Sequence, residues 1–177
     1  ARVKMAKAWQ RALRTLHLRL ALTLERHDPD DPERLAFHFH HAADDTRAGP
    51  LAAAAADRAF AALAFDRAAT LYAQALAWTP NPQPSRTLAL TIRHAESLVH
   101  AGRCGDAAPR YLAAAELSTN HNTSLELRRK AAEQYLVSGH LVAGLGVLRP
   151  LARDQGLPFP ETPGRAKYEA SPTGADR

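Results

Sequence analysis

Hydrophobic residues recur at steps of three and four along most of this chain, which is the spacing of one face of an α-helix. The clearest stretch runs from Ala54 to Pro80, and Tyr72 stands in it at helical spacing from several small residues. These small residues are Ala56, Ala59, Ala68 and Ala75. Since no alternating β-branched run is present, the pattern predicts an all-α protein whose paired helices approach closely. Tyr72, and Tyr111 in a second pair, are expected to be buried between alanines.

Prolines, glycines and aspartates divide the pattern into about eight helices. The segment TPNPQPS, residues 79–85, is the clearest break, because its three prolines prevent a helix from continuing. Equivalent small residues at Ala68, Ala107 and Gly144 are 39 and 37 residues apart, which indicates a degenerate repeat. We expect a right-handed α-solenoid of four hairpins over about 3–43, 47–78, 86–118 and 123–155. They form a repeat domain of residues 1–157, and 158–177 form a disordered or loosely packed tail.

Local signals predict where individual helices begin and turn. Ser85 follows the proline-rich linker and is expected to cap the fifth helix. Thr123 and Glu126 have the spacing of a capping box, which predicts a helix start at residue 123. Gly102 and Gly105 are expected to form the turn of the third hairpin.

Charge is uneven along the chain. The formal net charge is +5 with a pI near 9.8, and no acidic residue precedes Glu25. The same N-terminal helix carries a leucine stripe of Leu13, Leu16, Leu20 and Leu24, which favours a solvated basic face and a protein partner for the stripe. The alternative is a nucleic-acid-binding helical domain that uses this basic helix.

Cysteine content and hydropathy indicate the compartment. Cys104 is the single cysteine, so an internal disulfide is excluded and a reducing environment is favoured. No apolar stretch is long enough to cross a bilayer. We therefore expect a cytoplasmic protein without a membrane partner.

Four segments of the sequence resemble one family. They are HLRLALTLE (17–25), ERLAFHFHHAADDTRA (33–48), LAFDRAATLYAQAL (63–76) and AAEQYLVSGHLVAGLGVLRPLARDQGLPFPETP (131–163). These segments resemble the tetratricopeptide-like (TPR-like) helical repeat region of large bacterial signalling proteins. Such proteins combine a STAND-type ATPase with a Ser/Thr kinase domain or a transcription-factor module.

The resemblance implies a non-catalytic protein–protein interaction or sensor-scaffold module, since the catalytic residues of that family lie upstream of the repeats. No phosphate-binding GxxxxGK[ST] loop, Gly-rich kinase loop or HRD loop is present, so we expect neither enzymatic activity nor a cofactor. By resemblance, the positions that face a protein or peptide ligand are Asp57, Phe60, Glu96, Val99, His100, Arg129, Glu133 and Leu136. The sequence leaves open whether these side chains bind a ligand or pack against the next repeat.

The HFHH run is the best candidate for a metal site, but its spacing argues against one. His38 and His41 share a helix face while His40 points elsewhere, and no further ligand follows at suitable spacing. We therefore expect structural or exposed histidines and no bound metal. Interhelical hydrogen bonds are expected for the remaining histidines near helix ends or in stripes: His17, His94, His100 and His140.

The two terminal helices carry apolar residues that the array itself does not cover. In the last helix, Leu145, Leu148 and Leu151 are expected to be exposed, because only a proline-rich segment follows them. A solenoid needs terminal helices with polar outer faces. We therefore expect a detached piece of a longer signalling protein, whose neighbouring domains are its partners, or a chain that self-associates.

Overall fold

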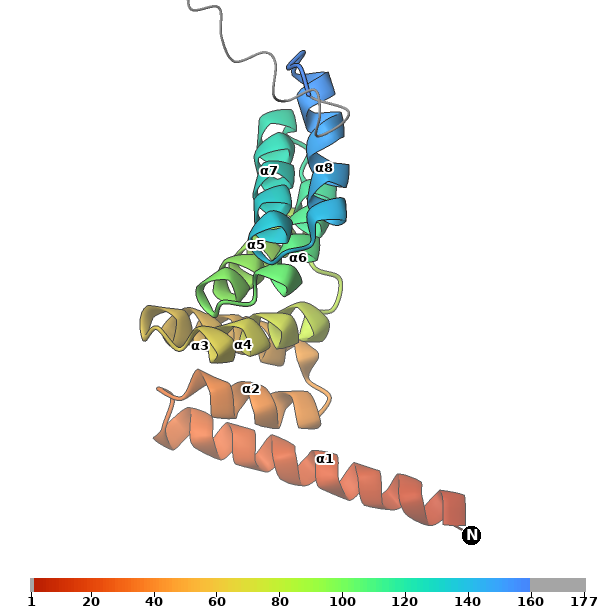
Figure 1. Ribbon diagram of the computed structural model, residues 1–177. Helices are drawn as coiled ribbons and strands as arrows, with labels where there is room; N and C mark the ends of the chain where they lie inside the picture. Colours follow the sequence, from red (N-terminus) through yellow and green to blue (C-terminus); the bar gives the residue numbers. More distant parts are fainter. Residues whose placement is uncertain (1, 160–177) are drawn as a thin grey trace, which may run out of the picture.

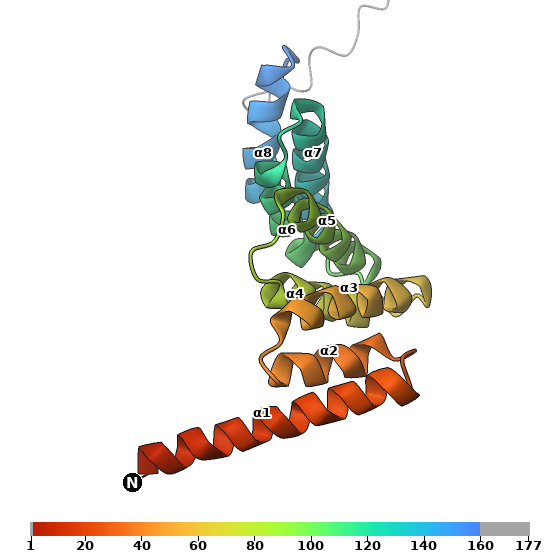
Figure 2. The same ribbon diagram turned by 180° about the vertical axis from the view of Figure 1, so that it is seen from behind.

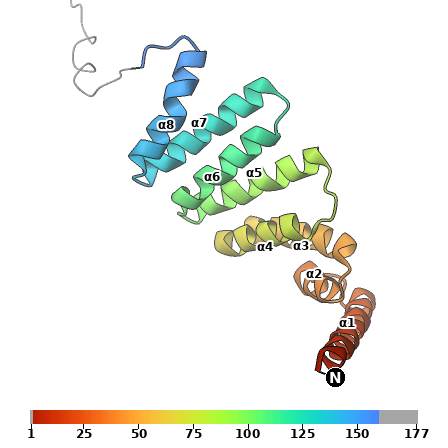
Figure 3. The same cartoon turned by 90° about the vertical axis from the view of Figure 1, so that its right-hand side faces the viewer.

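The computed structural model describes residues 2–159, which form an open array of helices (Figures 1, 2 and 3). Eight α-helices and no strand occupy this range. They are α1 (Arg2–His27), α2 (Pro32–His41), α3 (Asp45–Ala61), α4 (Phe65–Trp78), α5 (Pro84–His100), α6 (Cys104–Leu117), α7 (His121–Val137) and α8 (Leu141–Asp154). The extensive helix–helix contacts all join neighbours in sequence. The predicted all-α array of eight helices is confirmed, while its right-handed sense stays a prediction.

Four of the turns between helices have the same backbone geometry. In the turns that follow α2, α3, α5 and α7, the second residue beyond the helix adopts a positive φ. These residues are Ala43 (62°), Leu63 (60°), Gly102 (75°) and Gly139 (82°). The next amide then donates to a carbonyl five residues earlier, as from Arg103 N to Leu98 O at 2.8 Å. This hydrogen bond ends the preceding helix as a Schellman motif, so one turn type joins α2 to α3, α3 to α4, α5 to α6 and α7 to α8.

Three of the predictions about turn and cap residues are wrong. Asn120 caps α7 by accepting a hydrogen bond from the Thr123 amide at 3.0 Å, so the helix begins before the predicted capping box. Ser85 lies inside α5, because Pro84 at the first helical position already starts that helix. Gly105 is helical, and only Gly102 supplies the left-handed turn residue.

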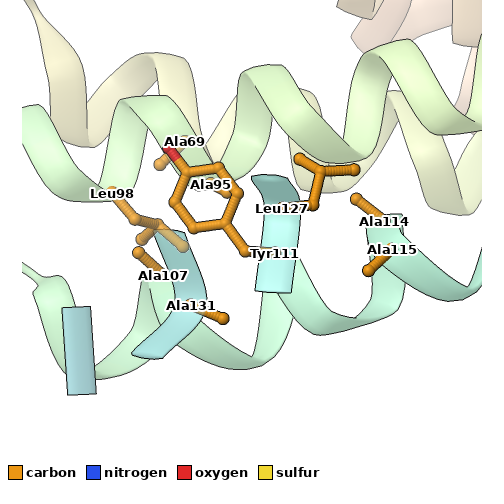
Figure 4. Close-up of a cluster of buried hydrophobic side chains, with 9 residues drawn as sticks. All are labelled: Ala69, Ala95, Leu98, Ala107, Tyr111, Ala114, Ala115, Leu127 and Ala131. Carbon is orange, nitrogen blue, oxygen red and sulfur yellow. The ribbon is translucent and has the colours of Figure 1, made fainter. Parts of the chain in front are cut away.

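The core consists mainly of alanine, with one large ring in each of several layers. Tyr72 is 1% exposed and Tyr111 is 4% exposed, which confirms that both are buried between paired helices. Figure 4 shows the Tyr111 ring among small and leucine side chains from α4, α5, α6 and α7. The ring fills space that the alanines leave open, so helices that are poor in large side chains still form a packed core between neighbours.

The two ends of the array differ in how well their apolar residues are covered. In α8, Leu151 is buried and both Leu145 and Leu148 are half-buried, so the expectation that all three leucines are exposed is wrong. In α1, by contrast, Leu16 is 53% exposed, and Leu13 and Leu20 are also exposed. The first helix therefore presents the larger uncovered apolar surface.

Two further sequence-based expectations concern the C-terminal tail and membrane crossing. Residues 160–177, most of the predicted tail, lie outside the described residues. Within residues 2–159, no helix combines the length and the apolar character needed to cross a membrane.

Candidate functional site

The eight predicted ligand-facing residues lie on α3, α5 and α7, one helix from each of three successive hairpins. None of them is buried. Asp57, His100, Arg129 and Glu133 are exposed, and Phe60, Glu96, Val99 and Leu136 are half-buried. We call this set the α3–α5–α7 face.

The face repeats along the array. Asp57, Glu96 and Glu133 are 39 and 37 residues apart, the same offsets as those between the equivalent small residues of the core. Phe60, Val99 and Leu136 follow at the same offsets, each three residues after a carboxylate. Since residues three apart share a helix face, each of these three hairpins contributes one acidic and one apolar position to the same surface.

Two of these residues also pack across the boundary between hairpins. The rings of Phe60 on α3 and His100 on α5 meet edge to face, with centroids 5.5 Å apart. Phe65 stacks on His100 at 4.8 Å, and the guanidinium of Arg93 lies 5.5 Å from the Phe60 centroid. For Phe60 and His100, therefore, packing against the next repeat is part of their role.

The carboxylates of the face, Asp57, Glu96 and Glu133, form an acidic row that lies near the two buried tyrosines. The Tyr72 hydroxyl donates a hydrogen bond to Asp57, and burial followed by this bond raises the pKa of Tyr72 above its ordinary value. Burial, followed by the charges of Glu96 and Glu133, raises the pKa of Tyr111 to about 12. Both phenols are therefore protonated at neutral pH.

Basic side chains lie beside the acidic row, and sequence reasoning missed two of them. Arg93 lies 3.7 Å from Glu96, and Arg129 lies 3.3 Å from Glu133. The Lys130 ammonium lies 5.8 Å from the Tyr111 centroid. Arg93 and Lys130 are 37 residues apart, so applying the repeat offset to the whole helix would have found both.

A hollow of about 460 Å³ adjoins the α7 end of the face. Arg129 and Leu125 of α7, Leu148 of α8 and Phe159 contribute to its lining. This hollow was not predicted, because it depends on where residues 155–159 lie after α8 ends.

The histidines form contacts of several kinds. His17 and His38 approach through their Nδ1 atoms at 2.9 Å, which confirms an interhelical hydrogen bond between α1 and α2. His40 points elsewhere, as expected: its Nδ1 lies 2.7 Å from Asp45, and its ring stacks on Trp78. His140 instead bonds Ser138 in its own turn.

His94 differs from the other histidines. Its Nδ1 is buried and has no hydrogen-bond partner, so this atom does not make the interhelical bond that was expected for His94. Burial, reinforced by Arg110 and Arg103, lowers the pKa of His94 to about 4. The ring contributes to a hollow of about 440 Å³ together with these two arginines.

In residues 2–159, no group of three or more histidine, cysteine, aspartate or glutamate residues is placed to hold a metal ion.

No protein-family model matches the chain, and no curated protein matches it. Among solved structures, the chain is similar to nearly identical TPR-like repeats of a Podosopora anserina protein provisionally named a kinesin light chain. That similarity has a TM-score of 0.45 and 14% identity, and it covers 86% of this chain and 92% of the other. A variant of the same protein gives a TM-score of 0.43 at 14% identity, with 86% and 93% covered.

Proposed function

We propose that this chain is a protein-interaction module that binds an extended peptide, or a segment of a neighbouring domain, across the α3–α5–α7 face. The observation that supports the proposal is the regular pair of rows, with carboxylates at Asp57, Glu96 and Glu133 and apolar residues three positions later. An extended segment that crosses the three helices would meet a polar and an apolar position at each of them. Stacked repeats commonly present surfaces of this kind.

The face carries both positive and negative side chains. It is therefore suited to a peptide that makes several specific polar contacts, and not to one that is attracted only by its net charge. Glu96 is paired with Arg93, and Glu133 is paired with Arg129. Arg93, Arg129 and Glu133 are exposed and Glu96 is half-buried, so each pair contributes little stability and can exchange its partner for a ligand group. The peptide would then bury the apolar row, and the ion pairs would select for polar groups of the peptide beside it.

A matched pair of charge reversals tests the proposal. Peptides selected from a random library on the whole chain would be measured by titration against Glu133→Lys in α7 and Glu116→Lys in α6, both at exposed positions. We expect Glu133→Lys to weaken binding about tenfold or more, and Glu116→Lys to leave it unchanged. Equal binding by both variants, with circular dichroism unchanged, would show that the face is not the site.

The chain is further proposed to be non-catalytic and to belong to a larger signalling protein, as its resemblance to bacterial ATPase and kinase repeat regions implies. Phosphoryl transfer needs positioned phosphate-binding amides, a lysine and metal-holding carboxylates, and the sequence offers no such motif. We expect the purified chain neither to hydrolyse ATP nor to phosphorylate a protein. Turnover that a point substitution within the chain abolishes would overturn this.

Nucleic-acid binding through α1 is the second candidate function, because Lys7, Arg11 and Arg14 are exposed on that helix. Binding through phosphates weakens steeply as salt rises, whereas binding in a mixed polar and apolar groove changes little. Titration with duplex and single-stranded oligonucleotides at two salt concentrations separates the two functions.

A further inference from the structure

The N-terminal helix presents a continuous apolar stripe that nothing in the array covers. Its large members are Met5 (72% exposed), Trp9 (73%), Leu13 (42%), Leu16 (53%) and Leu20 (41%). The helix packs on α2 through a different side, where Ala21 is fully buried against Leu35 and Phe39. At 3.6 residues per turn, that side lies about a third of a turn away from the stripe. Figure 1 shows α1 as the outermost helix, with its N-terminal part extending beyond α2.

The order of residues within the stripe has a two-fold symmetry. Apolar residues stand at 5, 9, 12, 13, 16 and 20, and these positions are unchanged when the helix is reversed about the point between Ala12 and Leu13. Two copies that meet in antiparallel orientation therefore place Met5 against Leu20 and Trp9 against Leu16. An isologous two-fold dimer needs this self-complementarity, whereas another partner has no reason to require it.

The area of the stripe is sufficient for such a dimer. If a fully exposed large apolar side chain presents roughly 200 Å², the five side chains expose about 550 Å² per copy. Two copies then bury about 1,100 Å² from the stripe alone, close to the lower end of stable specific interfaces, and flanking residues add to it.

Three basic residues of α1 point away from this pairing, and the exposed Arg19 lies at the edge of the stripe, where its long side chain can reach solvent. Lys7, Arg11 and Arg14 are exposed and lie on the side of the helix opposite the stripe, so they point away from a partner helix at the stripe. Ala12, at one edge of the stripe, allows close approach. The two basic helices still repel each other at longer range, and salt screens this repulsion.

We propose that the chain forms a two-fold dimer in which the α1 helices of two copies pair in antiparallel orientation through Met5, Trp9, Leu13, Leu16 and Leu20. The dimer leaves the α3–α5–α7 face out of the interface, so it does not rest on the proposed peptide binding.

Sedimentation of the whole chain over a concentration series, at low and high sodium chloride, tests the dimer. We expect a monomer–dimer equilibrium that strengthens as salt rises. Leu16→Glu should weaken it on the order of a hundredfold, because each dimer then buries two unpaired charges. Thr15→Glu is the matched control: it adds the same charge one residue away at an exposed position off the stripe, and the dimer should persist.

Cysteine cross-linking in a Cys104→Ser background tests the orientation. In the antiparallel pair the two copies of position 13 lie side by side, so Leu13→Cys should form a disulfide-linked dimer. The two copies of position 5 are about 22 Å apart along the helix axis, too far for a disulfide, so Met5→Cys should not cross-link with itself. Cross-linking at position 5 but not at 13 would overturn the antiparallel arrangement.

Three further results would overturn the dimer itself. The first is a monomer at every concentration. The second is dimerisation that Leu16→Glu does not affect. The third is a monomer that binds anionic lipid vesicles or oligonucleotides through α1, with binding that weakens as salt rises, because the stripe and the basic side would then serve a different partner.

Discussion

His94 is the residue with the most unusual environment in the described part of the chain. It is 6% exposed, its Nδ1 has no hydrogen-bond partner, and two arginines lie close enough to lower its pKa further. A protonated imidazole at this position would be a buried cation without a partner. The folded state therefore favours the neutral form.

Stability should consequently fall on mild acidification. The pKa of His94 is about 4 in the folded chain and 6.5 when the group is unperturbed, so the unfolded state binds more protons between these values. Unfolding free energy then rises with pH in this window, and lowering the pH from 7 to 5 should cost about 2 kcal/mol. Urea unfolding of the native chain and of His94→Gln at both pH values measures the effect. An equal loss in both proteins would show that other groups cause it.

The two buried tyrosines should be the most costly single positions to truncate. Tyr111 packs against Ala95, Leu98 and Leu127 from two neighbouring helices. Removal of its ring leaves a cavity that the surrounding helices cannot close. Tyr72→Ala and Tyr111→Ala should each cost about 3–5 kcal/mol of unfolding free energy. Tyr72→Phe keeps the ring and loses only the hydrogen bond to Asp57, at a cost of about 1–3 kcal/mol. A loss below about 0.5 kcal/mol in either alanine variant would mean that the ring is not packed in this way.

At the scale of single elements, the four equivalent turns use different residues for one backbone conformation. Gly102 and Gly139 adopt positive φ without a steric penalty, whereas Ala43 and Leu63 adopt it as L-residues with a side chain. An L-residue in this region costs about 1–2 kcal/mol. Leu63 is also 72% exposed, so its side chain gains little from packing in return.

Leu63→Gly should therefore stabilise the chain by about 1 kcal/mol, since relief of strain exceeds the extra entropy of glycine in the unfolded state. Gly102→Ala is the matched opposite, because an added methyl group would meet nothing within 4 Å and only the backbone would be strained. It should destabilise by about 1 kcal/mol. Urea midpoints that shift in the same direction for both variants would contradict the explanation.

Elements were easier to predict than their ends or the contacts between them. The helical period and the prolines of residues 79–85 are local signals, so all eight helices could be identified from the sequence. The start of α7 could not, because Asn120 and Thr123 are both good caps and only the three-dimensional structure decides between them. The predicted ligand-facing positions lie on one helix of each of three hairpins, but the packing of Phe60 on His100 depends on how two hairpins stack. The hollow beside Arg129 likewise depends on the chain beyond α8.

At the scale of the whole molecule, stability is divided among local layers. Leu35 and Phe39 belong to a cluster with Ala21 and Ala48 in the first three helices, and Tyr111 belongs to a separate cluster over α4–α7. Because the extensive contacts join only sequence neighbours, the array has no single core that every helix shares. Such an array approximates a row of units coupled to their neighbours, and local groups of helices can open without the rest.

Hydrogen exchange measured by mass spectrometry should reveal this division through a reciprocal pair of substitutions. Tyr111→Ala should accelerate amide exchange in α5–α7 on the order of a hundredfold, as expected for a local loss of about 3 kcal/mol, while amides of α2 keep their native protection. Leu35→Ala should do the opposite, accelerating exchange in α1–α3 and leaving α6 and α7 protected. If both variants accelerate the same set of amides, opening is global, and the array must be coupled from end to end by more than contacts between successive helices.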